Sequence, residues 1–510
     1  MNTYEMKDTV RMQATVGERT VLTELGQEFT LPDYQPEIKR LIRVKATVLP
    51  ADKYVGGGSA ECTGTVDYQI LYTGNDGALY STTQSGEYRF TVPTELPSDV
   101  ELGEGIVCDV TSVAEQMTGR VQAPRRLSVK CRLRSRIRFY ATRAIGGVAD
   151  GEDLERLYGE SVCVRRFLGT GEAVALADEI LCDANDRAMR VICAEGQVFL
   201  TEVTAGSGCV NCRGELCLKL LCCHDDAPTE PPYTVTRRIP FTQSVPVDGA
   251  EVNCEASARG TCTELRITVE EGRILCEASA VLEARAMRNE RIAYVRDLYS
   301  TKRACETAHT AVTLPQMIRC ANGNFSLNTA IPLEEVGIRA GLSVADLSGT
   351  VTLGETEAER GKYYLSGKCR FHAVLCGDGE FSAHELEVPF RYEMEGGEAI
   401  PADTDATVDL ISCRARVDGE RIGLDAELAV SVALTANAQV ALLTEAALGS
   451  ETECRHSSYT VCFPSREDTL WSVAKRYRIP VTALLARNDL AEAPAADSAE
   501  SLANVHFLLV

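Results

Sequence analysis

The 510-residue sequence lacks several features on which common classes of enzyme depend. It contains one tryptophan and six histidines, and no histidine lies in a His-Glu-x-x-His zinc motif or near a Gly-x-Ser-x-Gly nucleophile elbow. No Gly-x4-Gly-Lys-Ser/Thr phosphate-binding loop is present either. We therefore expect a protein that is not an enzyme and that needs no cofactor.

Basic residues and long apolar runs are also scarce. The chain has 52 basic against 74 acidic residues, and its net charge of −22 argues against general affinity for nucleic acid. The stretch nearest to an apolar run, 428–444, contains Ser, Thr, Asn and Gln and alternates as a strand does, so no membrane-spanning segment is expected. The first eight residues lack the basic start and apolar core of a signal peptide, so we expect the protein to stay in the cytoplasm.

Cysteine is abundant but does not form a disulfide pattern. The chain has 21 cysteines, an odd number, and without an export signal they are expected to be reduced thiols. A cluster between Cys209 and His224 has the residue types of a zinc site. The repeat described next places one of its members, Cys222, at a core position that Tyr72 and Leu375 fill in the other copies. We therefore favour structural thiols and expect no metal site.

An internal repeat of about 150 residues runs through the first 450 residues. Each copy has a glycine followed by apolar residues at every second position, then a phenylalanine, then a long alternating segment. The glycines are Gly64, Gly214 and Gly367, the phenylalanines are Phe90, Phe241 and Phe390, and the alternating segments begin at Leu127, Ile274 and Ile422. Period-two alternation predicts half-buried strands. We expect three tandem β-sandwich or open-barrel repeats, at 1–150, 155–306 and 307–450, followed by a small α+β module at 457–510.

The alternating segment of the first copy carries a basic stripe on the face opposite Leu127 and Val129. Residues two apart in a strand share a face, so the stripe is continuous. It consists of Arg126, Lys130, Arg132, Arg134, Arg136 and Arg138. Charge on a solvated edge that prevents aggregation is one interpretation. The other is a docking face for an acidic protein, for example the acidic unit of another copy.

The last fifty residues contain a specific motif. Asp468 or Thr469 is suited to cap a helix in which Leu470, Val473 and Tyr477 share one apolar face. The segment resembles a LysM module, a strand–helix–helix–strand unit that usually binds N-acetylglucosamine polymers. Both sugar-contacting loops depart from that family, since the loop 463–468 is longer and lacks its glycine, and the C-terminal loop lacks its glycine and its Ile-Pro ending. The resemblance therefore favours protein recognition, with glycan binding as the alternative.

Trp471 lies at the edge of the apolar helix face, about 100° from Leu470. Such a residue either packs the small core or acts as an interface hot spot. We select five candidate partner-binding residues in the module: Val461, Leu470, Trp471, Val473 and Tyr477.

Tandem β repeats that end in a LysM module resemble the SipL family of clostridial spore coat morphogenetic proteins, which are built from SPOCS domains and a terminal LysM. The segment Pro32–Glu37 is similar to the start of such domains. The resemblance implies a scaffold in the mother-cell cytoplasm that gathers at the outer surface of the forespore. It also implies that the LysM module docks on the coat morphogenetic ATPase to help encase the spore. The alternative is a cell-wall protein that binds peptidoglycan.

Overall fold

The computed structural model describes residues 2–3, 8–95, 100, 105–148, 153–159, 162–183, 189–224, 231–270, 273–397, 399–451, 460–490, 497–498, 502 and 505–510. Strands make up most of this part of the chain, and its two short helices lie near the C-terminus. The predicted class, mostly β with a small α+β module at the end, is confirmed.

Three β-sandwiches follow one another, and six long strands pair in the same way in each. The sixth strand lies between the first and the fifth, and the third lies between the second and the fourth. The first repeat comprises β2 (Asp8–Thr30), β3 (Arg40–Val48), β5 (Ser59–Thr73), β6 (Leu79–Pro93), β7 (Val107–Ala123) and β8 (Arg126–Val148), with a short β4 (Asp52–Gly56). The second comprises β10 (Val162–Asp183), β11 (Met189–Ala205), β12 (Cys209–His224), β13 (Tyr233–Pro246), β14 (Glu255–Glu270) and β15 (Arg273–Ile292). The third comprises β17 (Arg303–Pro332), β18 (Ser343–Glu359), β19 (Lys362–Gly377), β20 (Glu380–Glu395), β21 (Asp403–Asp418) and β22 (Arg421–Glu451).

Each sandwich has its own core, built from alternate residues of both sheets. In the first repeat Val66 and Tyr68 of β5 lie in one buried cluster with Leu127 and Val129 of β8. Equivalent clusters fill the second and third repeats. The period-two pattern in the sequence therefore marks the residues that the two sheets bury against each other.

The repeated glycine makes room for an aromatic ring on the neighbouring strand. Gly214 pairs with Phe241, and Gly367 pairs with Phe390. A Cβ atom on Gly367 would lie 2.4 Å from the Phe390 ring, so only glycine fits beneath that ring. In the first repeat the ring over Gly64 belongs to Tyr88. Tyr88 lies two residues before Phe90, which the internal repeat matched with Phe241 and Phe390.

The three sandwiches meet around a pseudo-threefold axis. Ile42, Ile192 and Ala345 lie at equivalent positions of the three repeats, 150 and 153 residues apart, and all three belong to one buried cluster. The contacts between neighbouring repeats follow the same order around this axis. The fourth strand of one repeat meets the second strand of the next, through Ser81 Oγ to the Ile192 carbonyl (2.5 Å) and Thr234 Oγ1 to the Ala345 carbonyl (3.4 Å).

A third contact returns from the last repeat to the first. Arg40 Nη1 at the start of β3 donates to the carbonyl of Phe381 on β20 (3.2 Å). A head-to-tail series whose last interface returns to the first member is a closed ring. The second and fifth strands of each repeat line a cavity of about 1580 Å³ along its axis. The repeats therefore form one body rather than a flexible string.

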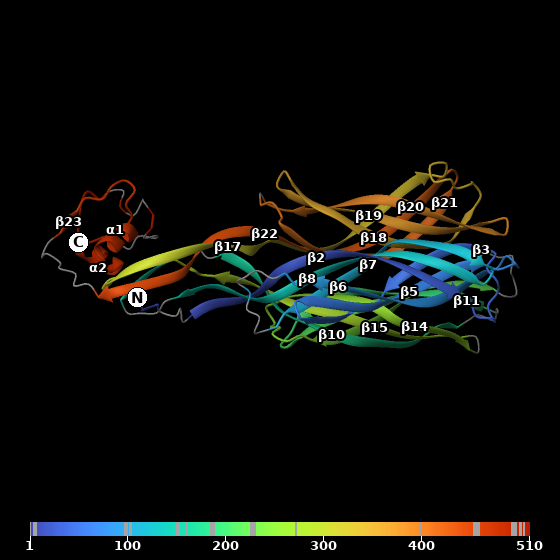
Figure 1. Ribbon diagram of the computed structural model, residues 1–510. Coiled ribbons are helices and arrows are strands. Elements are labelled where there is room, and N and C mark those ends of the chain that lie inside the picture. Colours follow the sequence, from blue (N-terminus) through green and yellow to red (C-terminus); the bar gives the residue numbers. More distant parts are fainter. Residues whose placement is uncertain are drawn as a thin grey trace.

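The C-terminal module lies apart from this ring. Figure 1 shows it at the far end of the molecule, beyond the ends of β17 and β22 that project from the sandwiches. It contains β23 (Val461–Cys462), α1 (Leu470–Tyr477), α2 (Val481–Arg487) and β24 (Leu508–Leu509), the predicted order of elements. Neither described helix is long or apolar enough to cross a bilayer. The two-stranded antiparallel sheet of β9 (Leu154–Tyr158) and β16 (Val295–Ser300) also lies at this end, where it packs on β22.

Candidate docking surfaces

The helix face chosen from the sequence forms the core of the module. Thr469 caps α1, with Ser472 completing a capping box, so the helix begins where the sequence indicated. Leu470 and Val473 are fully buried beside Leu484, and Tyr477 is half-buried against them. These three side chains hold the module together and present little surface to a partner.

Trp471 is buried, and it contacts another part of the same chain. Its Nε1 donates to Asp297 Oδ2 on β16 (2.8 Å), and its ring lies edge-on to Tyr299 with the centroids 4.9 Å apart. Lys475 Nζ, one turn further along α1, reaches both Asp297 oxygens (2.6 and 2.7 Å). The Tyr299 hydroxyl donates to the Ile479 carbonyl (2.7 Å). We call Asp297 and Tyr299 the seat of the module, because they fix the module on β16.

The two strands of the module carry a row of exposed apolar side chains, which we call the apolar strip. Cys462 and Leu508 point inward and are buried, so their neighbours on the two strands point outward. The strip consists of Val461 (47% exposed), Phe463 (76%), Phe507 (55%) and Leu509 (37%). Sequence reasoning found only Val461. Alternation of large apolar residues in 461–463 and 507–509 is the signal that could have found the others.

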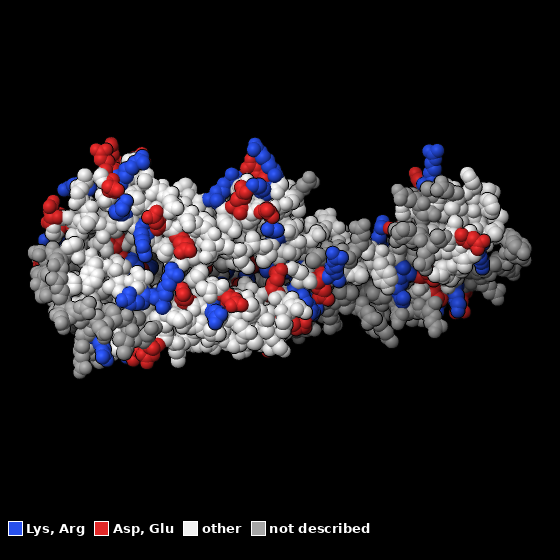
Figure 2. Space-filling model, turned by 180° about the vertical axis from the view of Figure 1, so that it is seen from behind, with Lys and Arg blue, Asp and Glu red and all other residues white. Residues whose placement is uncertain are grey.

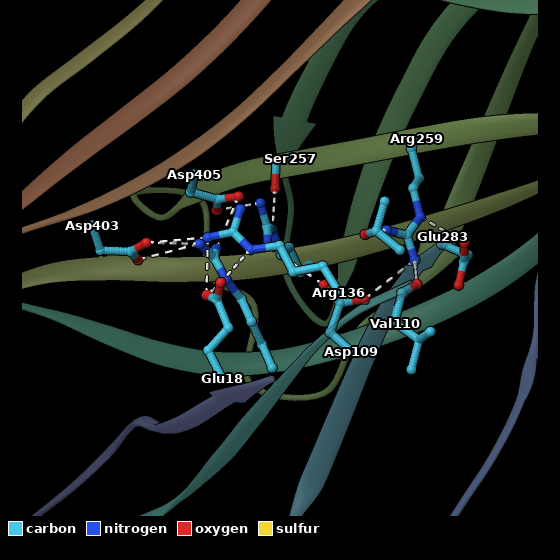
Figure 3. Close-up of polar contacts among 12 residues, drawn as sticks. Glu18, Asp109, Val110, Arg136, Ser257, Arg259, Glu283, Asp403 and Asp405 are labelled. Atoms are coloured by element: carbon cyan, nitrogen blue, oxygen red, sulfur yellow. Dashed lines mark hydrogen bonds and ion pairs between the residues drawn. The ribbon is translucent and has the colours of Figure 1, made fainter. Parts of the chain in front are cut away.

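The ring buries one end of the basic stripe on β8 and leaves the other end exposed. Its far end is buried at the junction of the repeats, where Arg138 pairs with Glu18 (2.9 Å), Asp403 (3.1 Å) and Asp405 (2.9 Å). Arg136 pairs with Glu18 and Asp403 as well. Figure 3 shows the carboxylates of Asp403 and Asp405, from the third repeat, directed at a group of guanidinium side chains near Glu18. This half of the stripe therefore docks on an acidic strand of its own chain.

Charge compensation at this junction is extensive. Burial alone would raise the pKa of Asp405, but Arg285 and Arg138 outweigh it and hold that pKa below its ordinary value. Arg259 of the second repeat reaches across to Asp109 (3.2 Å) and to the Val110 carbonyl (2.5 Å) of the first. All three repeats thus contribute charged groups to one network (Figure 3).

The other half of the stripe faces solvent. Arg126 and Lys130 are exposed, Arg132 pairs with Glu24 (3.2 Å) and Arg134 pairs with Glu115 (2.6 Å). Figure 2 shows basic and acidic side chains interspersed on the face of the ring that it presents. Docking of an acidic partner on Arg126 and Lys130 stays a prediction.

A second charged cluster, which the sequence did not indicate, lies near the axis. Arg43 of the first repeat pairs with Asp346 of the third (2.5 Å) and Glu195 of the second (3.0 Å), and its side chain is 4% exposed. Lys45 also pairs with Glu195 (2.6 Å). Burial would raise the pKa of Glu195, but Lys45 and Arg43 outweigh it and keep that pKa low. The equivalent position in the second repeat is Cys193, so the three repeats are not interchangeable here.

The cysteine cluster that resembled a zinc site lies along a single strand. Cys209, Cys212, Cys222 and His224 all belong to β12, whose ends are about 50 Å apart at 3.3 Å per residue. Cys212 and Cys222 are buried in the apolar core of the second repeat. The described residues contain no group of three or more Cys, His, Asp or Glu side chains placed to hold a metal ion. Extension along one strand explains why close spacing in sequence does not bring these groups together.

Comparison with protein families agrees with this architecture. A family model for the SipL SPOCS domain matches residues 187–270, which contain β11 to β14, and a LysM-domain model matches residues 465–493, which contain both helices of the module. The chain therefore carries a SipL-type SPOCS domain and a C-terminal LysM domain. SPOCS and LysM are non-catalytic domain families, and their combination marks a sporulation-related LysM protein. Comparisons with curated proteins and with solved structures each gave no match.

Proposed function

We propose that this SipL-type protein is a non-enzymatic scaffold of the spore coat that docks on the coat morphogenetic ATPase through its LysM module. The proposal places it in the mother-cell cytoplasm, at the outer surface of the forespore. The pairing of SPOCS and LysM domains supports the role in sporulation. We also propose that the first and third sandwiches are SPOCS domains like the second, because they share its strand order, and that the domains span 1–150, 155–306, 307–450 and 457–510.

The observation that carries the docking role is the separation of the module from a closed ring. The three repeats bury residues of their second, third and fourth strands in one cluster, while the LysM module stands at one end and is held there by polar contacts and by packing of Trp471 on Tyr299 (Figure 1). A rigid body with a recognition module at one end suits a protein that links a basement layer to further coat material. Its altered sugar loops favour a protein partner over a glycan.

Binding of the full-length chain to two kinds of target tests this proposal. Immobilised protein is offered purified coat ATPase with ATP, and in separate assays soluble protein is mixed with insoluble peptidoglycan and with chitin. We expect capture of the ATPase and no sedimentation with either glycan. Sedimentation with glycan and no capture of the ATPase would favour the cell-wall alternative.

A further inference from the structure

The apolar strip is continuous across both strands of the module. Val461 lies directly opposite Leu509, and continuing the same register places Phe463 opposite Phe507. Directly opposed side chains in an antiparallel pair are about 5 Å apart, so the four form one surface. Their exposed fractions correspond to roughly 400 Å² of apolar surface, a size that on a monomer is often functional.

The seat leaves this strip free to meet a large partner. β16 contacts the module through Trp471 and Lys475 of α1, the Ile479 carbonyl and Asp497, whereas the strip lies on the exposed face of the β23–β24 pair. Asn488 also holds β24 in place, since its side-chain amide bonds both the amide and the carbonyl of Leu509 (2.6 and 2.9 Å). The strip thus lies on two strands that are held in place, in the module at the far end of the molecule from the ring (Figure 1).

The chemistry of the strip favours a protein over a glycan or a second copy. Its four side chains carry no polar atom, whereas the hydroxyl and acetamido groups of a saccharide need hydrogen-bond partners when they are buried. A symmetric dimer through the strip would bury roughly 400 Å² on each copy, about half of what a stable interface needs. A different protein that extends beyond the strip can supply the remaining area.

The charge near the strip has both signs. The module, residues 457–510, holds five basic and six acidic residues. Arg466 and Glu467 are exposed close after Phe463, and Arg487 and Asp489 are exposed on either side of Asn488. The partner is therefore recognised by its apolar surface rather than by charge of one sign.

We infer that the apolar strip is the surface through which this chain binds a folded protein that presents an apolar ridge. The inference rests on the proposed function and identifies the side chains that perform it. It also assigns Trp471 a different role, since that residue orients the module on its own chain.

The test uses full-length protein with Phe463→Glu and Phe507→Glu combined. Leu176→Glu on β10 is the matched control, because it places the same charge at an apolar residue that is 78% exposed but far from the module. Fluorescence of Trp471, the sole tryptophan, reports whether the module remains folded and seated. We expect capture of the coat ATPase to fall by roughly tenfold or more in the double variant, with unchanged emission, and to be unaffected in the control.

The possible outcomes separate this inference from the proposed function. If the double variant captures the ATPase as well as the wild type does, the assignment of the strip as the binding surface is overturned, while the docking role stands. Sedimentation of the wild type with peptidoglycan, lost in the double variant, would make the strip a glycan surface and overturn the protein assignment. Failure of the wild type to capture the ATPase would overturn the proposed function, and the assignment of the strip would fall with it.

Discussion

The two ends of the basic stripe on β8 follow the same alternation of basic and apolar residues, but they have different surroundings in the fold. Arg138 is 7% exposed and contacts three carboxylates, two of them from the third repeat, whereas Lys130 faces solvent. Alternation decides only which face of a strand a side chain occupies. What covers that face depends on residues hundreds of positions away, in the repeats that close the ring.

Comparison of equivalent positions explains which end is covered. Arg138 and Arg285 follow the first residue of their alternating segments by the same number of positions, and both reach Asp405 of the third repeat. The third repeat has Ala433 at that position, so it provides the acid and the other two provide the bases. The junction is therefore asymmetric, and its charges match one arrangement of the three repeats.

The largest expected effect comes from breaking the buried end. Arg138→Met keeps a long side chain but leaves Asp405 and Asp403 with fewer cations, and removing one partner of a buried pair costs about 3–5 kcal/mol. We expect a loss of this order in the free energy of unfolding, measured by urea titration of the full-length chain. Arg126→Met at the exposed end is the control and should change it by less than about 0.5 kcal/mol. Equal losses in the two variants would show that the ends do not differ.

Lowering the pH should test the same difference between the two ends of the stripe. The pKa of Asp405 is lowered in the folded chain, chiefly because Arg285 and Arg138 outweigh the effect of burial, so this carboxylate stabilises the fold above its unfolded pKa of about 4. As the pH falls below that value the unfolded state binds protons first, and this stabilisation is progressively lost.

The difference in thermal midpoint between wild type and Arg138→Met should therefore be greatest near pH 7 and should narrow between about pH 4 and pH 2. Arg126→Met should follow the wild type throughout the range. A difference that stayed constant with pH would mean that Arg138 acts through packing of its side chain rather than through its charge.

The sequence was informative where structure is local. Period-two runs identified β5, β12 and β19 and the sixth strands of the repeats, because a half-buried strand repeats its environment every second residue. The N-cap and the apolar face of α1 were likewise predicted, since both depend on residues within four positions of one another.

Features that join distant segments could not be predicted in this way. Asp297 lies 174 residues before Trp471, and nothing near either residue indicates the other. Trp471 could be placed at the edge of its helix face, but whether a partner or the chain itself covers that edge depends on the path of β16. The cluster of Arg43, Glu195 and Asp346 near the axis could not be predicted either, because each residue alone has the pattern of an ordinary surface charge.

A smaller effect is expected at the seat of the module, which provides a contrast with the ring. Asp297→Asn keeps the acceptor oxygen for Trp471 but removes the ion pair with Lys475, a half-exposed contact worth about 1 kcal/mol or less. We expect faster hydrogen exchange in α1 and a shifted Trp471 emission, with the urea midpoint of the ring unchanged. Asp489→Asn, exposed on the same module, is the control. A change in the ring midpoint would contradict the independence of the two regions.

The smallest effect on stability is expected at the exposed end of the stripe. Arg126→Glu combined with Lys130→Glu reverses two charges at solvent-facing positions, so the free energy of unfolding should change by less than about 0.5 kcal/mol. If this end docks an acidic protein or the acidic surface of another copy, the wild type should associate more weakly as salt rises, because exposed charges are screened within about 10 Å at 0.1 M salt. The variant should lose both the association and its salt dependence, as measured by light scattering of the chain alone and by capture of the ATPase. Unchanged association in the variant would mean that these charges only keep the sheet face soluble, and that the stripe acts solely through its buried end.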